Sequence, residues 1–390
     1  MDKAKLNEGM KKYTMVIALL FVAMFFTWQT GGKLLLPQNV SNLIAQNAYV
    51  FVLATGMLLC ILTGGNIDLS VGSVVCFVGA VGAKLMESMG VNPVIAILVM
   101  LVIGTLIGAW QGFWIAFVRV PPFIVTLAGM LIFRGLSNVV LNGQTESITS
   151  GGFVKIFGGG ANCYIPDIFG IEGFNLTSML IGIITCVIYI AIQVVGRRNR
   201  IRKGYATDSL KSMIVKTTII CAVVLAFTYK ISMYRGIPTA LIWVVIVVLI
   251  YGYITSKTTT GRYFYAVGGN EKATKMSGIN TDKVYFLAYC NMGLLAALAG
   301  MLTIARMTSA QPTYGQNYEM DAIGACFIGG ASAYGGIGTV PGVIVGAVLM
   351  GVINLGMSIM GVDANYQRVV KGLVLLGAVI FDVLNKKSNK

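Results

Sequence analysis

The sequence contains no histidine among its 390 residues. Histidine is the commonest metal ligand and the usual general base near neutral pH, so its absence removes most familiar catalytic and metal sites. No segment matches the G-x-x-x-x-G-K-[ST] pattern of a Walker-type nucleotide cradle. The loose glycine spacing of GGIGTVPG (335–342) lacks a preceding strand, which a dinucleotide site requires. We therefore expect no catalytic residue, no metal site and no nucleotide bound by this chain itself.

Charged residues are also scarce, at 11% of the chain, against 56% hydrophobic residues and a mean hydropathy of +0.81. So few polar groups cannot cover a soluble surface. Apolar runs close to the length that crosses a hydrocarbon core of about 30 Å recur from end to end, and backbone in lipid must satisfy its own hydrogen bonds as helices. We predict an all-α, polytopic transmembrane helical bundle. The clear spans are roughly 13–30, 43–63, 70–88, 94–118, 122–141, 176–195, 213–230, 239–255, 284–305, 339–359 and 366–384.

Positive charge is in excess, with a net charge of +15, and it is clustered. The clusters lie before the first span, after the sixth, between the eighth and ninth, and at the C-terminus. Because Lys and Arg collect in cytoplasmic loops, all four clusters should be cytoplasmic, and both termini with them. The number of crossings is then even, so we count a short, glycine-rich segment at 322–333 as a twelfth span, although a half-helix or a re-entrant hairpin fits it as well. The count falls to ten if two segments are re-entrant. Charge spread over alternate loops disfavours a nucleic-acid partner and favours contact with lipid.

The chain is predicted to form one transmembrane domain over 1–390, with three longer polar connections. These are an extracytoplasmic loop at 142–175, a basic cytoplasmic loop at 196–212 and a cytoplasmic loop at 256–283. The first span is followed by WQTGGKLLLPQ rather than a small-x-small cleavage site, so we expect an uncleaved anchor. The seven cysteines contain no C-x-x-C pair and are expected to serve as small packing residues.

Glycine is abundant, with 48 residues, and several follow a four-residue spacing such as Gly104, Gly108 and Gly112. Small residues at this spacing allow membrane helices to approach closely, so helix packing is the expected role. Ionisable residues within the spans are few. An ion-driven carrier usually places carboxylates or broken helices near the membrane midplane, so the energy for any transport is expected to come from elsewhere.

The loop at 256–283 contains a short polar stretch with its own helix signals. Gly268 and Gly269 permit a turn, Asn270 can cap a helix start, and Glu271 suits the positive end of the helix dipole. Gly278 would end a helix of about two turns, with the apolar Ile279 just beyond. Such a helix could dock in a groove of a soluble partner, although an ordinary polar connector explains the same pattern.

Three stretches resemble a known family. The arrangement of Glu271, Ala273, Gly278 and Ile279 resembles the loop by which permease subunits of ATP-binding-cassette (ABC) importers contact their ATPase partners, and GRYFYAVGGNEKATKMSGIN (261–280) is similar to the ribose, xylose and galactose permeases. TGGNIDLSVGSVV (63–75) and the segment 321–362 resemble the same family. A basic segment with two extra spans, roughly Arg197–Tyr253, is similar to the longer xylose or multiple-monosaccharide type.

This resemblance implies a permease subunit that pairs with a second copy in the inner or plasma membrane of a prokaryote. Two ATPase domains would bind ATP and Mg²⁺ and grip the cytoplasmic loops, with Gly268, Gly269, Asn270, Glu271, Ala273, Gly278 and Ile279 as the coupling residues. An extracytoplasmic binding protein would deliver a monosaccharide. A furanoside, a nucleoside or a branched-chain amino acid is the alternative cargo, and an ion-coupled secondary transporter is the alternative mechanism. A membrane-embedded enzyme is disfavoured.

Two further groups of residues are weaker candidates. Asn66, Asp68 and Ser70 could fix a gate or line a polar route, but Asp68 or Ser70 could equally cap the following helix. The binding protein could land on the loop 142–175 and the segment 308–319, whose hydroxyl and amide groups suit a protein or a sugar, although a long polar loop can also be merely flexible. The candidate docking residues are Tyr314, Gln316, Asn317 and Tyr318.

Overall fold

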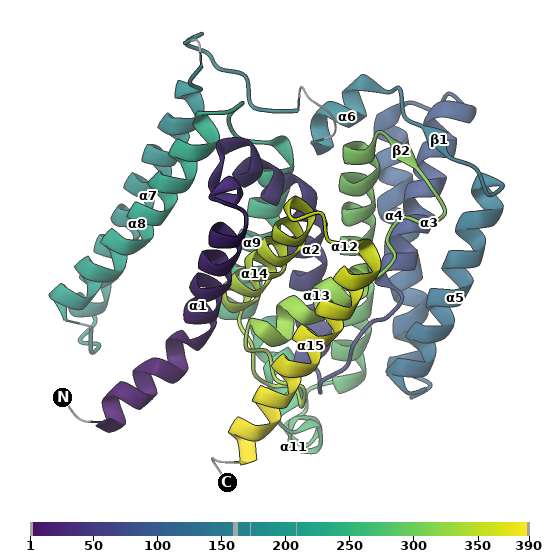
Figure 1. Cartoon of the computed structure of the whole chain (residues 1–390). Helices are drawn as coiled ribbons and strands as arrows, with labels where there is room; N and C mark the ends of the chain where they lie inside the picture. The colour runs from purple at the N-terminus through teal and green to yellow at the C-terminus, as the bar shows by residue number, and fades with distance from the viewer. Residues whose placement is uncertain (1–2, 159–162, 172, 208, 388–390) are drawn as a thin grey trace. The chain divides into compact units, whose positions relative to one another are not determined.

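The computed structural model describes residues 3–158, 163–171, 173–207 and 209–387, and it is helical along most of that length (Figure 1). One pair of two-residue strands joins two loops. The elements are α1 (Lys3–Gln29), η1 (Lys33–Leu35), α2 (Pro37–Leu62), α3 (Val71–Ala83), η2 (Lys84–Ser88), α4 (Pro93–Ala116), α5 (Pro122–Leu141), β1 (Glu146–Ser147), α6 (Gly151–Phe157), α7 (Leu176–Arg202), α8 (Leu210–Ser232), α9 (Thr239–Lys257), α10 (Thr259–Gly269), α11 (Glu271–Met276), α12 (Thr281–Met307), β2 (Ser309–Ala310), α13 (Tyr318–Ile328), α14 (Val340–Ile359) and α15 (Ala364–Lys387).

Within the described residues, nine helices are long and apolar enough to cross a membrane. They are α2, α3 with η2, α4, α5, α7, α8, α9, α12 and α14. Helix α1 adds a shorter apolar run, Met15–Gln29. All eleven clear spans of the sequence lie in helices, so the prediction of an all-α polytopic membrane bundle is confirmed. The chain is a multi-pass membrane protein.

The helix ends follow the capping chemistry of the sequence. The Asn92 side chain accepts a hydrogen bond from the Val94 N–H at 2.9 Å, and Pro93 occupies the first position of α4, where no N–H is needed. The Thr339 hydroxyl caps α14 by accepting from the Gly342 N–H at 3.2 Å. Local residues of these types therefore place the boundaries of the long helices.

The segment counted as a twelfth span forms a short helix rather than a full crossing. The helix there is α13, Tyr318–Ile328, whose 11 residues extend about 16 Å, or roughly half of a hydrocarbon core. Of the alternatives for 322–333, the half-helix agrees with this length, and the helix ends at Ile328 rather than at residue 333. Gly330 adopts a left-handed φ of +81°, and residues 329–339 form an irregular glycine-rich segment, here called the glycine loop.

The chain divides into two units by contact. Unit 1 comprises the described residues of Met1–Leu34, Leu43–Cys163 and Ala240–Lys390, and unit 2 comprises those of Leu35–Asn42 and Tyr164–Thr239. In unit 1, α4 packs along α12 through the predicted glycine stripe (Figure 1). A Cβ at Gly104 would meet the Gly293 carbonyl oxygen, and one at Gly108 would meet the Tyr289 carbonyl oxygen. Close backbone approach, as expected from the four-residue spacing, therefore holds these two helices together.

A second group of helices in unit 1 surrounds α13. Helix α14 presents Gly342 and Gly346 to the C-terminal backbone of α13. Helix α15 reaches α13 through an ion pair between the Lys371 ammonium and the Asp321 carboxylate, 2.9 Å apart. The short α13 is therefore held on both sides by long neighbouring helices.

In unit 2, α7 and α8 form a helical hairpin in which Gly182 lies against the Thr228 side chain. At the end of the hairpin where α7 begins, the Asn175 amide donates to the carbonyl oxygens of Ile165 at 3.1 Å and Arg235 at 3.3 Å. The hairpin exposes apolar side chains along both helices, as lipid-facing helices do.

Candidate functional site

The short helix predicted after Asn270 is present as α11. The Asn270 side-chain oxygen accepts a hydrogen bond from the Ala273 N–H at 3.0 Å, and Gly278 follows the helix with a left-handed φ of +84°. The predicted turn at Gly268 and Gly269 is wrong, because both residues belong to the last turn of a preceding helix, α10. We call residues 259–280, which contain α10 and α11, the coupling segment.

The outward face of α11 is small, basic and apolar. The side chains of Lys272, Ala273, Lys275 and Met276 are exposed, and Met276 reaches 90% exposure. Thr274 is buried on the opposite face, where its hydroxyl donates to the Ala266 carbonyl oxygen at 2.8 Å. The apolar side chain available to a partner is therefore Met276 rather than the half-buried Ile279.

Arg119, in the connection between α4 and α5, ties the coupling segment to the membrane helices. Its guanidinium donates to the Glu271 carboxylate at 2.9 Å and also pairs with Asp282 at the start of α12. It lies over the Tyr285 ring, 5.4 Å from the centroid, and the Tyr285 hydroxyl donates to Glu271 at 3.1 Å. We call this set of four residues the Arg119 clamp. Arg119 itself has a left-handed φ of +65°, which is uncommon outside glycine.

The clamp changes the protonation of its members. Partial burial favours a raised pKa for Glu271, but hydrogen bonds from Arg119 and Tyr285, together with the Arg119 charge, outweigh it and lower the pKa below its usual value. Burial acts to lower the pKa of Arg119, yet its hydrogen bond and charge interaction with Glu271 and the Asp282 charge raise it. Both partners of the pair are therefore held in their charged forms.

The inner face of the coupling segment contacts the membrane helices closely. A Cβ at Gly268 would collide with the Leu62 carbonyl oxygen at the end of α2 and would lie 2.5 Å from the Gly336 nitrogen in the glycine loop. The Gly336 N–H in turn donates to the Leu62 oxygen at 3.0 Å, and the Tyr265 hydroxyl donates to the Gly338 oxygen at 2.8 Å. Movement of the coupling segment would therefore reach α2 and the glycine loop directly.

The candidate gate residues lie in the turn between α2 and α3. The buried Asp68 carboxylate accepts from the Ser70 N–H at 2.8 Å and the Ser70 hydroxyl at 2.7 Å, and the Gln111 amide of α4 donates to that hydroxyl at 2.7 Å. The Asn66 amide approaches the Thr63 hydroxyl at 3.4 Å. Asp68 thus closes the turn before α3 within a network that reaches α4, but neither Asp68 nor Ser70 caps α3 with its side chain. A role in gating stays a prediction.

The candidate docking residues lie beyond the C-terminal end of α12, opposite the end that carries Asp282. The 27 residues of this helix extend about 40 Å. Strands β1 and β2 pair antiparallel and join the two segments predicted to meet a binding protein. Arg134 donates to the carbonyl oxygen of Tyr314 at 2.6 Å, and Gln316 is exposed while Asn317 is half-buried. Residues 159–162 and 172 of the predicted outer loop lie outside the described residues.

Tyr318 faces inward instead. Its ring stacks on Tyr49 of α2, with centroids 3.5 Å apart, beside a small recess of about 40 Å³. The polar residues that line this recess are Gln46, Tyr49, Thr303, Arg306 and Tyr318. The Tyr49 hydroxyl also donates to the buried Asp321 carboxylate at 2.7 Å. Polar side chains within membrane-spanning helices usually face protein or a water-filled space rather than lipid.

Comparison with known proteins identifies the family. A family model described as the branched-chain amino acid transport system / permease component matches residues 39–379. The chain belongs to this permease family. It is 36% identical over 379 residues to the xylose transport system permease protein XylH of Escherichia coli K12, covering 97% of this chain and 93% of that protein. Identity to XylH of Haemophilus influenzae is 36%, covering 98% of each chain. The ribose import permease protein RbsC of E. coli K12 is 35% identical, covering 97% and 94%. No solved structure matched.

Sequence reasoning missed Arg119 and the pairing of Asp321 with Lys371. Arg119 stands 152 residues before Glu271, and nothing in its local sequence indicates a partner. Asp321 and Lys371 are separated by 50 residues, although each is a charge inside or beside an apolar span. A charged residue in an apolar span is the one signal that could have indicated this pair, because charges within membrane spans usually pair with one another.

Proposed function

We propose that this chain is the membrane-spanning permease subunit of an ABC importer that takes up a monosaccharide. The observation that carries the proposal is an ordered coupling segment, held by the Arg119 clamp and packed on α2 and the glycine loop. It occurs in a member of a permease family whose relatives include xylose and ribose permeases. Such a segment offers an ordered contact surface through which a soluble ATPase can move the membrane helices.

The working assembly would contain a second permease copy, two ATPase domains that bind ATP and Mg²⁺, and an extracytoplasmic binding protein. ATP binding closes the ATPase domains and displaces α11. Because Gly268 touches the end of α2 and the glycine loop, that displacement shifts both. The bundle then changes which side of the membrane it opens to, in the inner or plasma membrane of a prokaryote.

Xylose and ribose are the first cargoes to test, because permeases named for them match nearly the full length of the chain. Galactose is the next. The sequence identities to the xylose and ribose permeases, 36% and 35%, are too similar to favour one pentose over the other. The binding protein is expected to carry most of the selectivity.

The experiment is reconstitution of the permease with its ATPase and binding protein in liposomes. We expect sugar uptake that requires ATP, and ATP hydrolysis that rises when the sugar-loaded binding protein is added. Liposomes that contain the permease alone are the control and should take up nothing.

An ion-coupled secondary transporter is the alternative, and uptake by the permease alone under a proton or sodium gradient would establish it. The description of the matching family favours testing a branched-chain amino acid as a second cargo class. ATP-dependent uptake of leucine with no uptake of any pentose or hexose would replace the sugar assignment while leaving the importer mechanism intact.

A further inference from the structure

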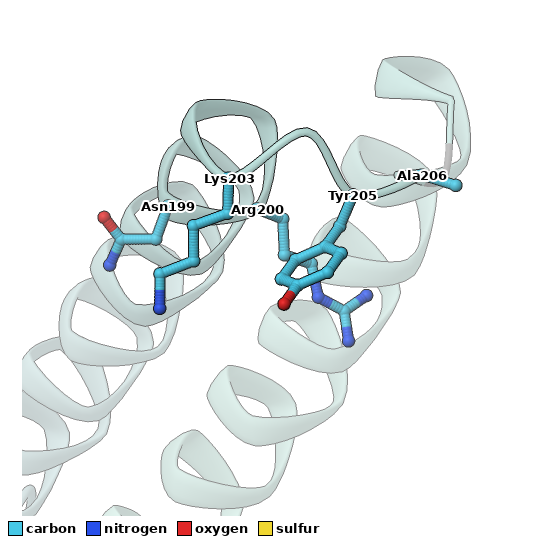
Figure 2. Close-up of a pocket in the computed structure, with 5 residues that line it drawn as sticks. All are labelled: Asn199, Arg200, Lys203, Tyr205 and Ala206. Atoms are coloured by element: carbon cyan, nitrogen blue, oxygen red, sulfur yellow. The ribbon is translucent and has the colours of Figure 1, made fainter.

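The turn between α7 and α8, at one end of the unit 2 hairpin, contains a recess of about 410 Å³. Asn199, Arg200, Lys203, Tyr205 and Ala206 line it (Figure 2). Figure 2 shows the Arg200, Lys203 and Tyr205 side chains at the border of the recess, with Lys203 directly after the end of α7. Two cations, an amide and a phenol thus border one concave site.

The recess lies in the most basic connection of the chain. Residues 196–216 contain seven Lys or Arg and one acidic residue, Asp208, which is outside the described residues. In the described part of the chain, no carboxylate forms an ion pair with Arg200 or Lys203. A forked guanidinium beside an ammonium is well suited to the oxygens of a phosphate group.

The backbone at the end of α7 does not compete for these donors. The Arg200 carbonyl oxygen accepts from the Lys203 N–H at 3.2 Å and from the Tyr205 N–H at 3.0 Å. These bonds close the helix end, so its carbonyl groups do not require the Arg200 or Lys203 side chains. The cationic groups are consequently available to an outside anion.

Apolar surface begins within a turn or two of the recess. Ile201 is 57% exposed on α7, and Leu210 and Ile214 are 53% and 51% exposed on α8. A free phosphate would use only the polar part of this surface, whereas a phospholipid would place its phosphate in the recess and its acyl chains along the helices. A tyrosine between charged and apolar surface, as Tyr205 is here, is typical of a membrane–water interface.

We propose that this recess is a binding site for the phosphate headgroup of an anionic phospholipid, which holds the α7–α8 hairpin at a fixed depth in the cytoplasmic leaflet. Arg200 and Lys203 neutralise the phosphate, and Tyr205 packs against the glycerol region. Each charge-assisted hydrogen bond to the phosphate strengthens binding by about tenfold. This site is independent of the transported cargo.

The test is a lipid titration of the full-length chain, delipidated in detergent and followed by native mass spectrometry. Phosphatidylglycerol and phosphatidylcholine with the same acyl chains are compared. We expect tighter binding of phosphatidylglycerol, weakened about 100-fold by the double variant R200Q/K203Q, as two tenfold effects of direct contacts predict. The matched control R202Q/K211Q removes the same charge from the same connection but leaves the recess residues intact, and it should retain binding.

Equal weakening in the two double variants would overturn the proposal, because it would mean that net charge rather than the recess attracts lipid. Equal binding of the two lipids would also overturn it. Glycerol phosphate and inorganic phosphate are titrated in the same way as the last two comparisons. If either binds as tightly as phosphatidylglycerol, the site belongs to a free phosphate, and the lipid assignment is wrong.

Discussion

At the scale of single residues, Arg119 is the clearest target for mutation. Its guanidinium joins Glu271 in the coupling segment to Asp282 in α12, and R119A removes both contacts. Exposed ion pairs contribute about 0.2–1 kcal/mol each, so the free energy of unfolding should change little. We expect the sugar transported per ATP hydrolysed to fall roughly tenfold, within the usual range for coupling between sites.

Two variants control this measurement in the reconstituted transporter. R262A removes an exposed arginine from the same coupling segment and should leave the transport ratio unchanged. R119K keeps the charge but loses the fork that reaches two carboxylates, so its ratio should lie between those of the wild type and R119A. Wild-type coupling in R119A would show that the clamp does not transmit force.

The protonation of Glu271 gives a second residue-scale prediction. Its pKa is lowered, so the ionised form favours the folded clamp at every pH above the unfolded value of about 4.3, and this contribution is lost as the pH falls through the folded pKa. In R119A the main stabilising charge is gone, and the Glu271 pKa should rise. The carboxyl ¹³C chemical shift of labelled glutamate, compared with that of an E271Q sample, measures this change. Identical titrations in wild type and R119A would contradict it.

At the scale of elements, two adjacent glycines at the end of α10 allow a test of whether glycine is needed there for close packing or for chain flexibility. A Cβ at Gly268 collides with the Leu62 backbone, whereas nothing lies within 4 Å of a Cβ at Gly269. G268A should lower the stability by about 1–3 kcal/mol, as overpacking usually does, and should impair coupled transport. G269A should leave both unchanged. The thermal midpoint in detergent and the ATP-dependent uptake are the readouts, and equal effects of the two variants would refute this role for Gly268.

The contact between α4 and α12 allows a similar comparison. G108A places a methyl group against the Tyr289 and Cys290 backbone, whereas G135A on α5 meets open space. We expect G108A to lower the thermal midpoint. G135A should match or exceed the wild type, since alanine favours helix over glycine by about 0.5–1 kcal/mol. A stable G108A protein would mean that the glycine stripe tolerates separation of the two helices.

Sequence reasoning located elements better than it located contacts. Apolar length and the cap at Asn270 predicted the long helices and α11, because both signals are local. Helix α10 was missed because its polar sequence was assigned to a loop, and the end of α13 was misplaced because Gly329 and Gly330 stop the helix inside an apolar run. Arg119 was missed because its partners arrive only when distant helices pack. Long-range pairing is what a single sequence does not contain.

At the scale of the whole molecule, helix α12 connects the Arg119 clamp to the β1–β2 pair. Its first turn holds Asp282 of the clamp, and its last turn leads into β2, which pairs with β1 of the loop 142–175. Both regions lie in unit 1 and are separated by a helix of about 40 Å, enough to cross a membrane. The proposed ATPase contact at one end of α12 and the proposed binding-protein contact at the other are therefore compatible with one helix that joins them.

This arrangement predicts opposite labelling of the two ends. In a background where the seven cysteines are replaced by alanine, M276C introduces a thiol at a 90% exposed position of α11, and Q316C introduces one at an exposed position beyond β2. A membrane-impermeant maleimide should label only Q316C in intact cells and only M276C in inverted membrane vesicles. Bound ATPase should protect M276C, because α11 is its proposed contact. Labelling of M276C from outside the cell would place the coupling segment where no ATPase can reach it, and the importer mechanism proposed for this chain would then fail.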